Sequence, residues 1–283
     1  MEYWKDRKIF FVTAHQKEEI VRDLFEHELQ MKVESCKVDT DRYGTFSGDV
    51  EREGSQEEVL VRKAKEAAEK FGKEHIYLSS EGAFYPSPRI PFVNENTEML
   101  FLYDPLRNVE IKAVYVTLNV KFLQEDIQLS IPEQALKKFG FPQEGIILKG
   151  FTESNQCVIV RKNFESIAQL EEEFQMERVV HPQLKWRLES DMRAHKNSVR
   201  RMAILNCAEH LIQKMKSLCP QCSHTGFSVT KNEYGLPCSW CGTPTDLLKK
   251  EIFSCSKCGY SNEINFPRGI EYADPGNCYH CNP

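Results

Sequence analysis

Residues 217–283 contain four Cys-x-x-Cys pairs: CPQC at 219–222, CSWC at 238–241, CSKC at 255–258 and CYHC at 278–281. Two residues between cysteines let the backbone form a tight knuckle, so that both sulfurs of a pair reach one metal ion. Four thiolates at tetrahedral corners are the preferred ligands of a structural zinc ion. The sequence therefore predicts two structural Zn²⁺ sites, whose ligands are Cys219, Cys222, Cys238, Cys241, Cys255, Cys258, Cys278 and Cys281.

The segments between the knuckles leave their pairing open. Each is long enough for a β-hairpin, which would bring the first pair to the second and the third to the fourth. A nested arrangement, in which the second pair meets the third and the first meets the fourth, is the alternative. Because so short a segment has few large apolar residues, zinc binding must supply much of its stability. We expect a zinc-ribbon domain with two four-cysteine sites at residues 217–283, after an α/β domain at residues 1–216.

Charge and composition argue against several classes of protein, among them nucleic-acid-binding, membrane and secreted proteins. The chain has a formal net charge of −5, and the single basic stretch lies at 185–216. The zinc segment lacks a basic patch, which argues against nucleic acid as its partner and favours a structural or protein-contact role. No run of apolar residues approaches the length of a membrane span, and the N-terminus does not resemble a signal peptide. Cysteine pairs of this spacing without an export signal predict a cytoplasmic metalloprotein.

Apolar periodicity predicts an α/β arrangement in the first part of the chain. Strands are expected at 8–13, 33–38 and from 76, alternating with helices at 18–29 and 56–71. This order favours a mixed sheet with some parallel strands and crossover helices. Beyond a Pro-rich loop at 85–92 we expect antiparallel strands at 99–103, 111–120 and 127–129. A hairpin should follow, formed by 145–150 and 157–161. A helix at 164–175 and a long basic helix at 191–218 should complete this part of the chain.

Three candidate sites follow from the first part of this pattern. Residues 13–17 (TAHQK) join a strand end to a helix start, which is typical of an anion site; the alternative is a plain helix start with a surface lysine. Residues 79–82 (SSEG) place a carboxylate directly after a strand, where α/β folds bind ligands. Acidic side chains could hold Mg²⁺ against a phosphate, or belong to a solvated loop; they are Asp39, Asp41, Asp49, Glu51, Glu53, Glu57 and Glu58.

The fourth candidate is the basic stretch 191–201. In a continuous helix, Arg193, Lys196 or Asn197, and Arg200 would share one face, and Asp191 would meet His195. The alternative is a solvent-facing basic helix that pairs with the acidic remainder of the domain.

Two resemblances add to these patterns. The stretch SDMRAH at 190–195, together with the four knuckles and the run GLPCSWCGTPT at 235–245, resembles a family of uncharacterised bacterial proteins without an established activity. Residues 8–204 resemble the nucleoside triphosphate pyrophosphatases that hydrolyse inosine and xanthosine triphosphates. The similar motifs, in chain order, are Thr13-x-His15-x-Lys17, Gly44-Thr45-Phe46 with Glu58 and Lys63-Ala64, Glu81-Gly82, and Ser198-Val199-Arg200.

The second resemblance implies a nucleoside-triphosphate-pyrophosphatase-like fold and a role for each matched residue. Lys17, Thr13 and His15 would hold the triphosphate, Glu58 and Glu81 would hold Mg²⁺ and activate water, and Arg200 would meet the substrate. Lys63, Arg193 and His195 complete the candidate substrate-binding set. The resulting hypothesis is a metal-dependent hydrolase of nucleoside triphosphates or a related phosphate compound. The alternative is a non-catalytic module that recognises a nucleotide, or a protein partner through its zinc ribbons.

Overall fold

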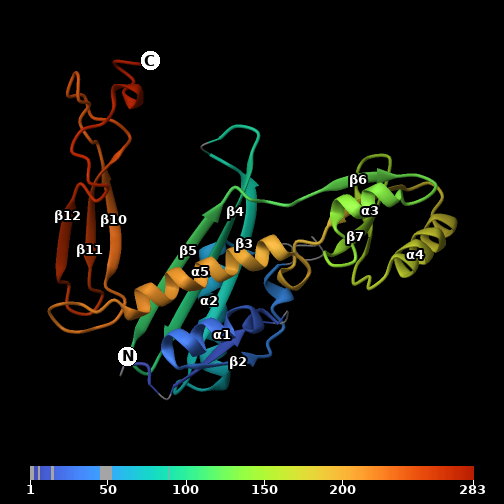
Figure 1. Cartoon of the computed structure of the whole chain (residues 1–283). Coiled ribbons are helices and arrows are strands. Elements are labelled where there is room, and N and C mark those ends of the chain that lie inside the picture. Colours follow the sequence, from blue (N-terminus) through green and yellow to red (C-terminus); the bar gives the residue numbers. More distant parts are fainter. Residues whose placement is uncertain (1–2, 6, 14–15, 45–52, 89) are drawn as a thin grey trace. The chain divides into compact units, whose positions relative to one another are not determined.

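A computed structural model describes residues 3–5, 7–13, 16–44, 53–88 and 90–283. The chain divides into two compact units, Met1–Leu211 and Ile212–Pro283 (Figure 1). The first unit contains two sheets and the second contains one.

The first sheet of the larger unit has five strands in the order β2-β1-β3-β4-β5. Its strands are β1 (Lys8–Val12), β2 (Lys32–Cys36), β3 (Ile76–Pro86), β4 (Asn94–Asp104) and β5 (Val109–Thr117). β1 pairs in parallel with both β2 and β3, whereas β3, β4 and β5 are antiparallel neighbours. The predicted mixed sheet with crossover helices is therefore confirmed.

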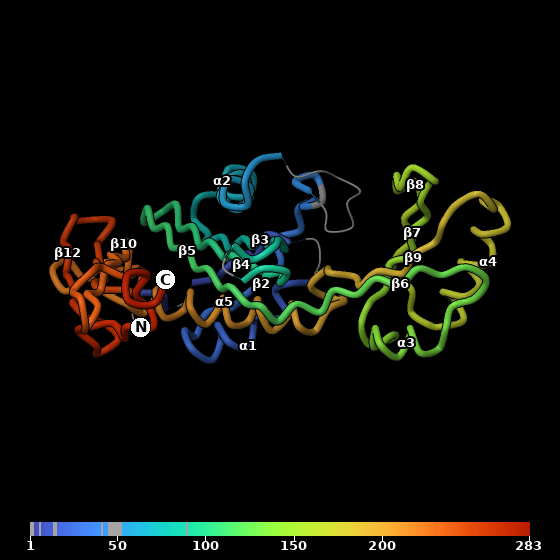
Figure 2. The backbone as a smooth tube through the Cα atoms, turned by 90° about the horizontal axis from the view of Figure 1, so that it is seen from above, coloured from blue at the N-terminus to red at the C-terminus, as the bar shows by residue number. Residues whose placement is uncertain are grey.

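Helices cover both faces of this sheet. α2 (Gln56–Phe71) lies on one side, and α1 (Lys17–Leu29) and α5 (Ser198–Lys216) lie on the other (Figure 2). The bounds of α2 agree with the prediction because Ser55 and Glu58 form a capping box at its first turn. On the α2 side, the core consists of Val12, Cys36, Leu60, Ala64, Ala67, Ala68, Tyr77 and Phe101.

The second sheet has the order β6-β9-β7-β8 and a core of its own. Its elements are β6 (Gln124–Ile127), β7 (Ile146–Phe151), β8 (Cys157–Arg161), β9 (Lys185–Ser190), α3 (Glu133–Phe139) and α4 (Ile167–Val180). β7 and β8 form the predicted hairpin. β9 was not among the expected strands, although buried Trp186 and Leu188 alternate with charged residues there. This short strand is placed between β6 and β7 by tertiary pairing.

The predicted helix at 191–218 is wrong at its start. α5 begins at Ser198, and only a short 3-10 helix (Ala194–Lys196) precedes it. The side-chain oxygen of Asn197 accepts a hydrogen bond from the backbone N–H of Arg200 at 2.9 Å. This is the geometry of a helix N-cap, and it starts the helix within the basic stretch rather than ahead of it.

The smaller unit is a three-stranded antiparallel sheet in the order β10-β11-β12. Its strands are β10 (Ser228–Tyr234), β11 (Leu248–Ser254) and β12 (Ser261–Asn265). Two further 3-10 turns lie at Asp41–Tyr43 in the larger unit and at Pro275–Asn277 in the smaller one.

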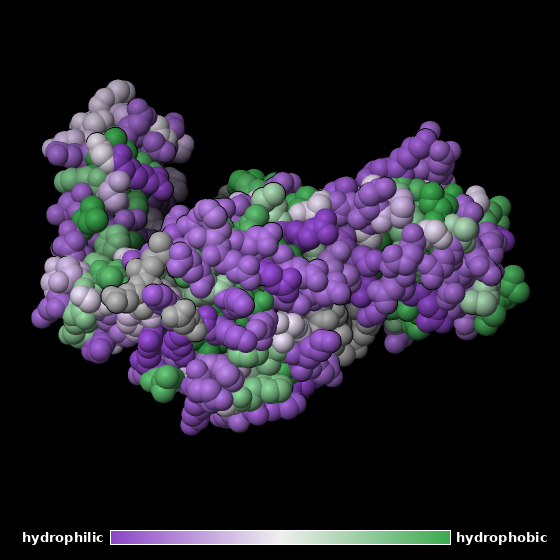
Figure 3. All heavy atoms as spheres, turned by 60° about the horizontal axis from the view of Figure 1, so that its bottom comes forward, coloured by the Kyte–Doolittle hydropathy of each residue, from purple (hydrophilic) through white to green (hydrophobic). Residues whose placement is uncertain are grey.

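Hydrophilic side chains dominate the molecular face seen in Figure 3, and apolar ones are scattered among them. Among the helices that the structure describes, none has the length and apolarity that a membrane crossing requires.

Candidate functional sites

The eight cysteines form two tetrads in an interleaved order. The first pair joins the third (Cys219, Cys222, Cys255 and Cys258), and the second joins the fourth (Cys238, Cys241, Cys278 and Cys281). Four zinc-bound thiolates with Zn–S bonds of about 2.3 Å have sulfurs roughly 3.8 Å apart. Sγ–Sγ distances across the knuckles are 3.6 and 3.7 Å in the first tetrad, and 3.6 and 3.8 Å in the second. Both donor sets therefore fit a zinc ion.

This pairing corrects both arrangements that the sequence analysis considered. The sequential order assumed that each segment between knuckles is a hairpin, which returns the chain to its starting end. Each of the first two segments instead contains one strand, β10 or β11, and the third contains β12. A seven-residue strand carries the chain about 20 Å along the sheet. Because the three strands form an antiparallel meander, odd-numbered knuckles gather at one end and even-numbered knuckles at the other.

The knuckles have the backbone turns that metal ligation requires. Gly242 and Gly259 follow the second and third pairs with φ values of 72° and 73°, a left-handed conformation that glycine adopts without strain. Their N–H groups donate to the carbonyls of Cys238 and Cys255 at 2.9 and 3.1 Å. Hydrogen bonding to Thr243 lowers the pKa of Cys241 to about 6, whereas the contact with Cys241 raises the pKa of Cys281 in the same tetrad.

The larger unit contains a cluster of charged side chains at the boundary between β1 and β3. Lys17 Nζ donates to Ser80 Oγ at 2.9 Å, and Lys63 forms a buried ion pair with Glu81. We call the five charged residues gathered here the charge cluster: Lys17, Lys63, Glu81, Glu98 and Arg200.

The position of the charge cluster follows from the sheet topology. β1 pairs with β3 only as far as Phe11 opposite Leu78. Since β3 continues, Ser80 and Glu81 lie just beyond the carboxyl end of β1. The chain leaves β1 toward β2 on one side and returns to β3 on the other, so this boundary is a topological switch point. Ligands of open α/β sheets bind outside the strand ends at such points.

Gly82 leaves room for a buried ion pair within the charge cluster. Arg200 Nε lies 2.8 Å from Glu98 Oε1, and each side chain is 1% exposed. A Cβ atom on Gly82 would approach Arg200 Nη2 and Glu98 Oε1 to 2.6 Å each. The absence of a side chain at position 82 is therefore required for the pair. Glu98 Oε2 accepts no hydrogen bond from the described residues.

The charge cluster contains three cationic side chains and two carboxylates. Burial lowers the pKa of Lys17 to about 7, and the nearby positive charges of Arg200 and Lys63 contribute to the same shift. The lysine is thus poised between its two protonation states near neutral pH. An excess of positive charge at a strand end favours an anionic ligand.

Three other residues predicted to bind the triphosphate or Mg²⁺, namely Thr13, His15 and Glu58, do not belong to the charge cluster as defined above. Thr13 is buried and lines a cavity of about 480 Å³ together with Gln16, with Ser35 in β2 and with Asp39 after it. His15 lies outside the described residues. The exposed carboxylate of Glu58 accepts hydrogen bonds from Ser55 N and Oγ at 2.8 and 2.9 Å, which lowers its pKa and places it at the start of α2.

The predicted shared face of basic residues at 191–201 is wrong, because residues 191–197 precede the helix. Arg193 is buried against Asp191, with Nε 2.9 Å from Oδ1, and its Nη2 donates to Asn163 at 2.7 Å. Asp191 forms its ion pair with Arg193, and His195 is partly buried in the 3-10 turn. The alternative of a solvent-facing basic helix is also wrong for Arg193 and Arg200, which are buried, whereas Arg201 is exposed.

The acidic cluster does not form a single site in the described part of the chain. Glu57 pairs with Lys112, and Glu58 belongs to the capping box. Asp39 lines the cavity beside Thr13. Asp49 and Glu51 lie outside the described residues.

Glu98 is the residue of the charge cluster that the sequence analysis missed. Near the start of its strand, Glu95, Asn96, Thr97 and Glu98 are all buried. The available signal was the run of five polar residues, 94–98, that opens an otherwise apolar strand, because charges buried with such a strand require partners.

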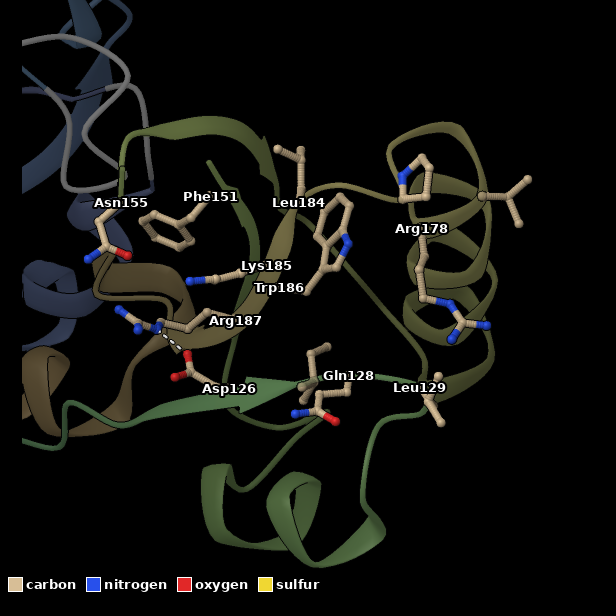
Figure 4. Close-up of a pocket in the computed structure, with 13 residues that line it drawn as sticks. Asp126, Gln128, Leu129, Phe151, Asn155, Arg178, Leu184, Lys185, Trp186 and Arg187 are labelled. Atoms are coloured by element: carbon tan, nitrogen blue, oxygen red, sulfur yellow. Dashed lines mark hydrogen bonds and ion pairs between the residues drawn. The ribbon is translucent and has the colours of Figure 1, made fainter. Parts of the chain in front are cut away.

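A larger cavity, of about 740 Å³, lies on the second sheet (Figure 4). Phe151, Lys185 and Trp186 line it, together with the ion pair between Arg187 Nε and Asp126 at 2.6 Å. None of the predicted site residues that the structure describes lines it. Asp126, the one carboxylate among the described lining residues, is already paired, so this cavity offers no acid–base or metal-ligand set there.

Comparison with known proteins identifies the family. The family described as a domain of unknown function, DUF6671, matches residues 63–283. The chain belongs to this family, as the resemblance of its C-terminal half to an uncharacterised family predicted. No curated protein matches the chain.

Among solved structures, the crystal structure of protein VC0702 from Vibrio cholerae is similar at a TM-score of 0.32 and 11% identity. The match covers 73% of this chain and 93% of that one. A TM-score this low supports no conclusion about fold or function. Neither comparison names an activity.

Proposed function

We propose that the larger unit is a phosphohydrolase that acts on nucleoside triphosphates or a related phosphate compound, and that the zinc sites are structural. The observation that carries this proposal is the charge cluster at the carboxyl end of β1, beside the continuing strand β3. Three cationic groups converge there on two carboxylates, at the position where α/β sheets bind phosphate ligands.

Each side chain of the charge cluster has a role in this proposal. Lys17, which a hydrogen bond to Ser80 holds in place, neutralises the phosphate charge together with Lys63 and Arg200. Glu81 positions and deprotonates the attacking water. A bound Mg²⁺ ion would polarise the phosphoryl oxygens. The buried Glu98 Oε2, which has no hydrogen-bond partner among the described residues, is an oxygen donor of the kind Mg²⁺ accepts.

We expect the protein to release pyrophosphate or phosphate from at least one nucleoside triphosphate when Mg²⁺ is present. Glu81→Gln should lower the turnover rate by about a hundredfold or more while nucleotide binding persists, because the amide retains the shape but cannot accept a proton. The measurement is product release across a panel that includes inosine and xanthosine triphosphates, with calorimetry for binding.

Glu110→Gln is the matched control, since Glu110 is an exposed carboxylate that pairs with Lys65 on the surface. Its rate should equal that of the unmodified protein. A chain that holds both zinc ions but turns over nothing in the panel contradicts the hydrolase. That result would favour the non-catalytic binding module instead.

Affinity for a phosphate ligand should fall as the pH rises through about 7. The anion binds the protonated form of Lys17, whose pKa in the free protein is about 7. Below that pH the ammonium is already present, whereas above it binding must take up a proton, which weakens the affinity up to about tenfold per pH unit.

Lys17→Arg provides the reference for this pH dependence, because a guanidinium stays protonated throughout the range. The ratio of the two affinities, measured by calorimetry from about pH 6 to pH 9, removes the contribution of the ligand's own ionisation. A ratio that is constant with pH would show that Lys17 does not contact the anion.

A further inference from the structure

The second cysteine tetrad carries exposed aromatic rings that neither the zinc site nor the core requires. Trp240 and Tyr279 lie between the cysteines of its two knuckles and are 79% and 74% exposed. Tyr272 is 61% exposed and precedes Ala273, whose carbonyl accepts a hydrogen bond from Ser239 N at 3.0 Å. Three rings thus border a single metal site.

The first tetrad is built in the same way but lacks these rings. The central residues of its knuckles are Pro220 and Gln221, and Ser256 and Lys257. Beside its cysteines, the ring of Phe227 contacts the rings of Phe253 and Tyr260. Zinc ligation alone therefore does not explain exposed rings at the other end of the sheet.

The two segments that build the second tetrad are acidic in sequence, and Lys249, Lys250 and Arg268 lie just outside them. These segments, residues 236–247 and 270–283, contain Asp246, Glu271 and Asp274 but no lysine or arginine. The Tyr279 hydroxyl hydrogen-bonds to Asp246, so one carboxylate lies against an exposed ring. A zinc ion with four thiolates remains net negative and adds to this charge.

Exposed aromatic faces beside carboxylates match one class of ligand. A guanidinium stacks on the face of tryptophan or tyrosine and pairs with a carboxylate, whereas a phosphate backbone would be repelled. We propose that this end of the zinc unit, formed by Trp240, Tyr272, Tyr279 and Asp246, is a docking surface for an arginine-rich segment of a partner protein. The surface is independent of the charge cluster in the larger unit.

The test is calorimetric titration of the full-length zinc-loaded protein with a blocked peptide of four arginines separated by glycines. We expect saturable binding that weakens with salt, and no binding of the matching peptide with citrulline in place of arginine. Trp240→Ala and Tyr279→Ala should each weaken binding about two- to fivefold, the range for cation–π contacts at exposed sites. Zinc content, measured in parallel, should stay at two ions per chain in both variants.

Phe92→Ala is the control, because Phe92 is a fully exposed ring in the larger unit, away from the second tetrad in the chain. Its affinity for the peptide should not change. Equal binding of the citrulline peptide, an unchanged affinity in both ring variants, or preferential binding of a uridine decamer would each overturn the proposal. The last result would identify the rings as a base-stacking platform instead.

Discussion

Replacing Cys219 and Cys255 together will leave one zinc ion per chain, whereas replacing Cys219 and Cys238 together will leave none. The first double substitution to serine damages a single tetrad, and the second damages both. A tetrad that lacks one thiolate loses its closed ligand shell and most of its affinity. The measurement is zinc content by elemental analysis after gel filtration.

The same two variants distinguish the three possible pairings. A sequential pairing would reverse the outcome, because Cys219 and Cys238 would then belong to one site. A nested pairing would leave no zinc in either variant. One zinc ion in the Cys219→Ser/Cys238→Ser protein would therefore contradict the interleaved order.

Loss of both zinc ions should unfold the smaller unit. The binding energy of a structural zinc ion is about 10–16 kcal/mol in small peptides, and this small unit has few large apolar residues to replace it. Hydrogen exchange should rise throughout residues 217–283 when a chelator removes the metal. Protection of β1 and β3 serves as the internal control, since the larger unit has its own cores.

Arg200→Met should lower the free energy of unfolding of the larger unit by about 3–5 kcal/mol, because it leaves the Glu98 carboxylate buried without its partner. In a unit of this size that loss lowers the melting temperature by roughly 10 °C. Calorimetric melts at neutral pH measure it.

Arg42→Met is the matched control, since Arg42 pairs with Glu66 at the surface and both side chains are exposed. A surface pair contributes about 0–1 kcal/mol, so its melting temperature should change little. Combining Arg200→Met with Glu98→Gln should restore part of the lost stability, because the unpaired charge is removed. Equal melting temperatures for Arg200→Met and the unmodified chain would contradict the buried pair.

Helices and strands of the larger unit were predictable where residues close together in the sequence fix their ends and their buried face. The helix at 56–71 was predictable because Ser55 and Glu58 cap it and its apolar residues repeat on one face. The mixed sheet followed from the alternation of strands and helices. The start of α5 was not predictable from apolar spacing, because the side chain of Asn197 and the hydrogen bonds that Glu144 accepts from Ser198 set it.

The charge cluster was predictable only in part. Lys17, Glu81 and Arg200 follow from motifs at a strand end and a helix start, and Lys63 follows from its place in a matched motif. Glu98 was not predicted, because no local pattern connects it to Arg200, which is 102 residues away in the chain. Antiparallel pairing of β3 with β4 sets Glu98 opposite Gly82, and packing of α5 brings Arg200 to it.

The sequence by itself determined which cysteines form the two candidate metal sites, because spacing within each Cys-x-x-Cys pair is a local property of one turn. Which pairs share a metal was decided by the tertiary structure. Three single strands, rather than hairpins, carry the chain from end to end of a small sheet, so alternate knuckles meet. The spacing within each turn therefore determines the ligands, and the antiparallel pairing of three consecutive strands determines which knuckles share a metal ion.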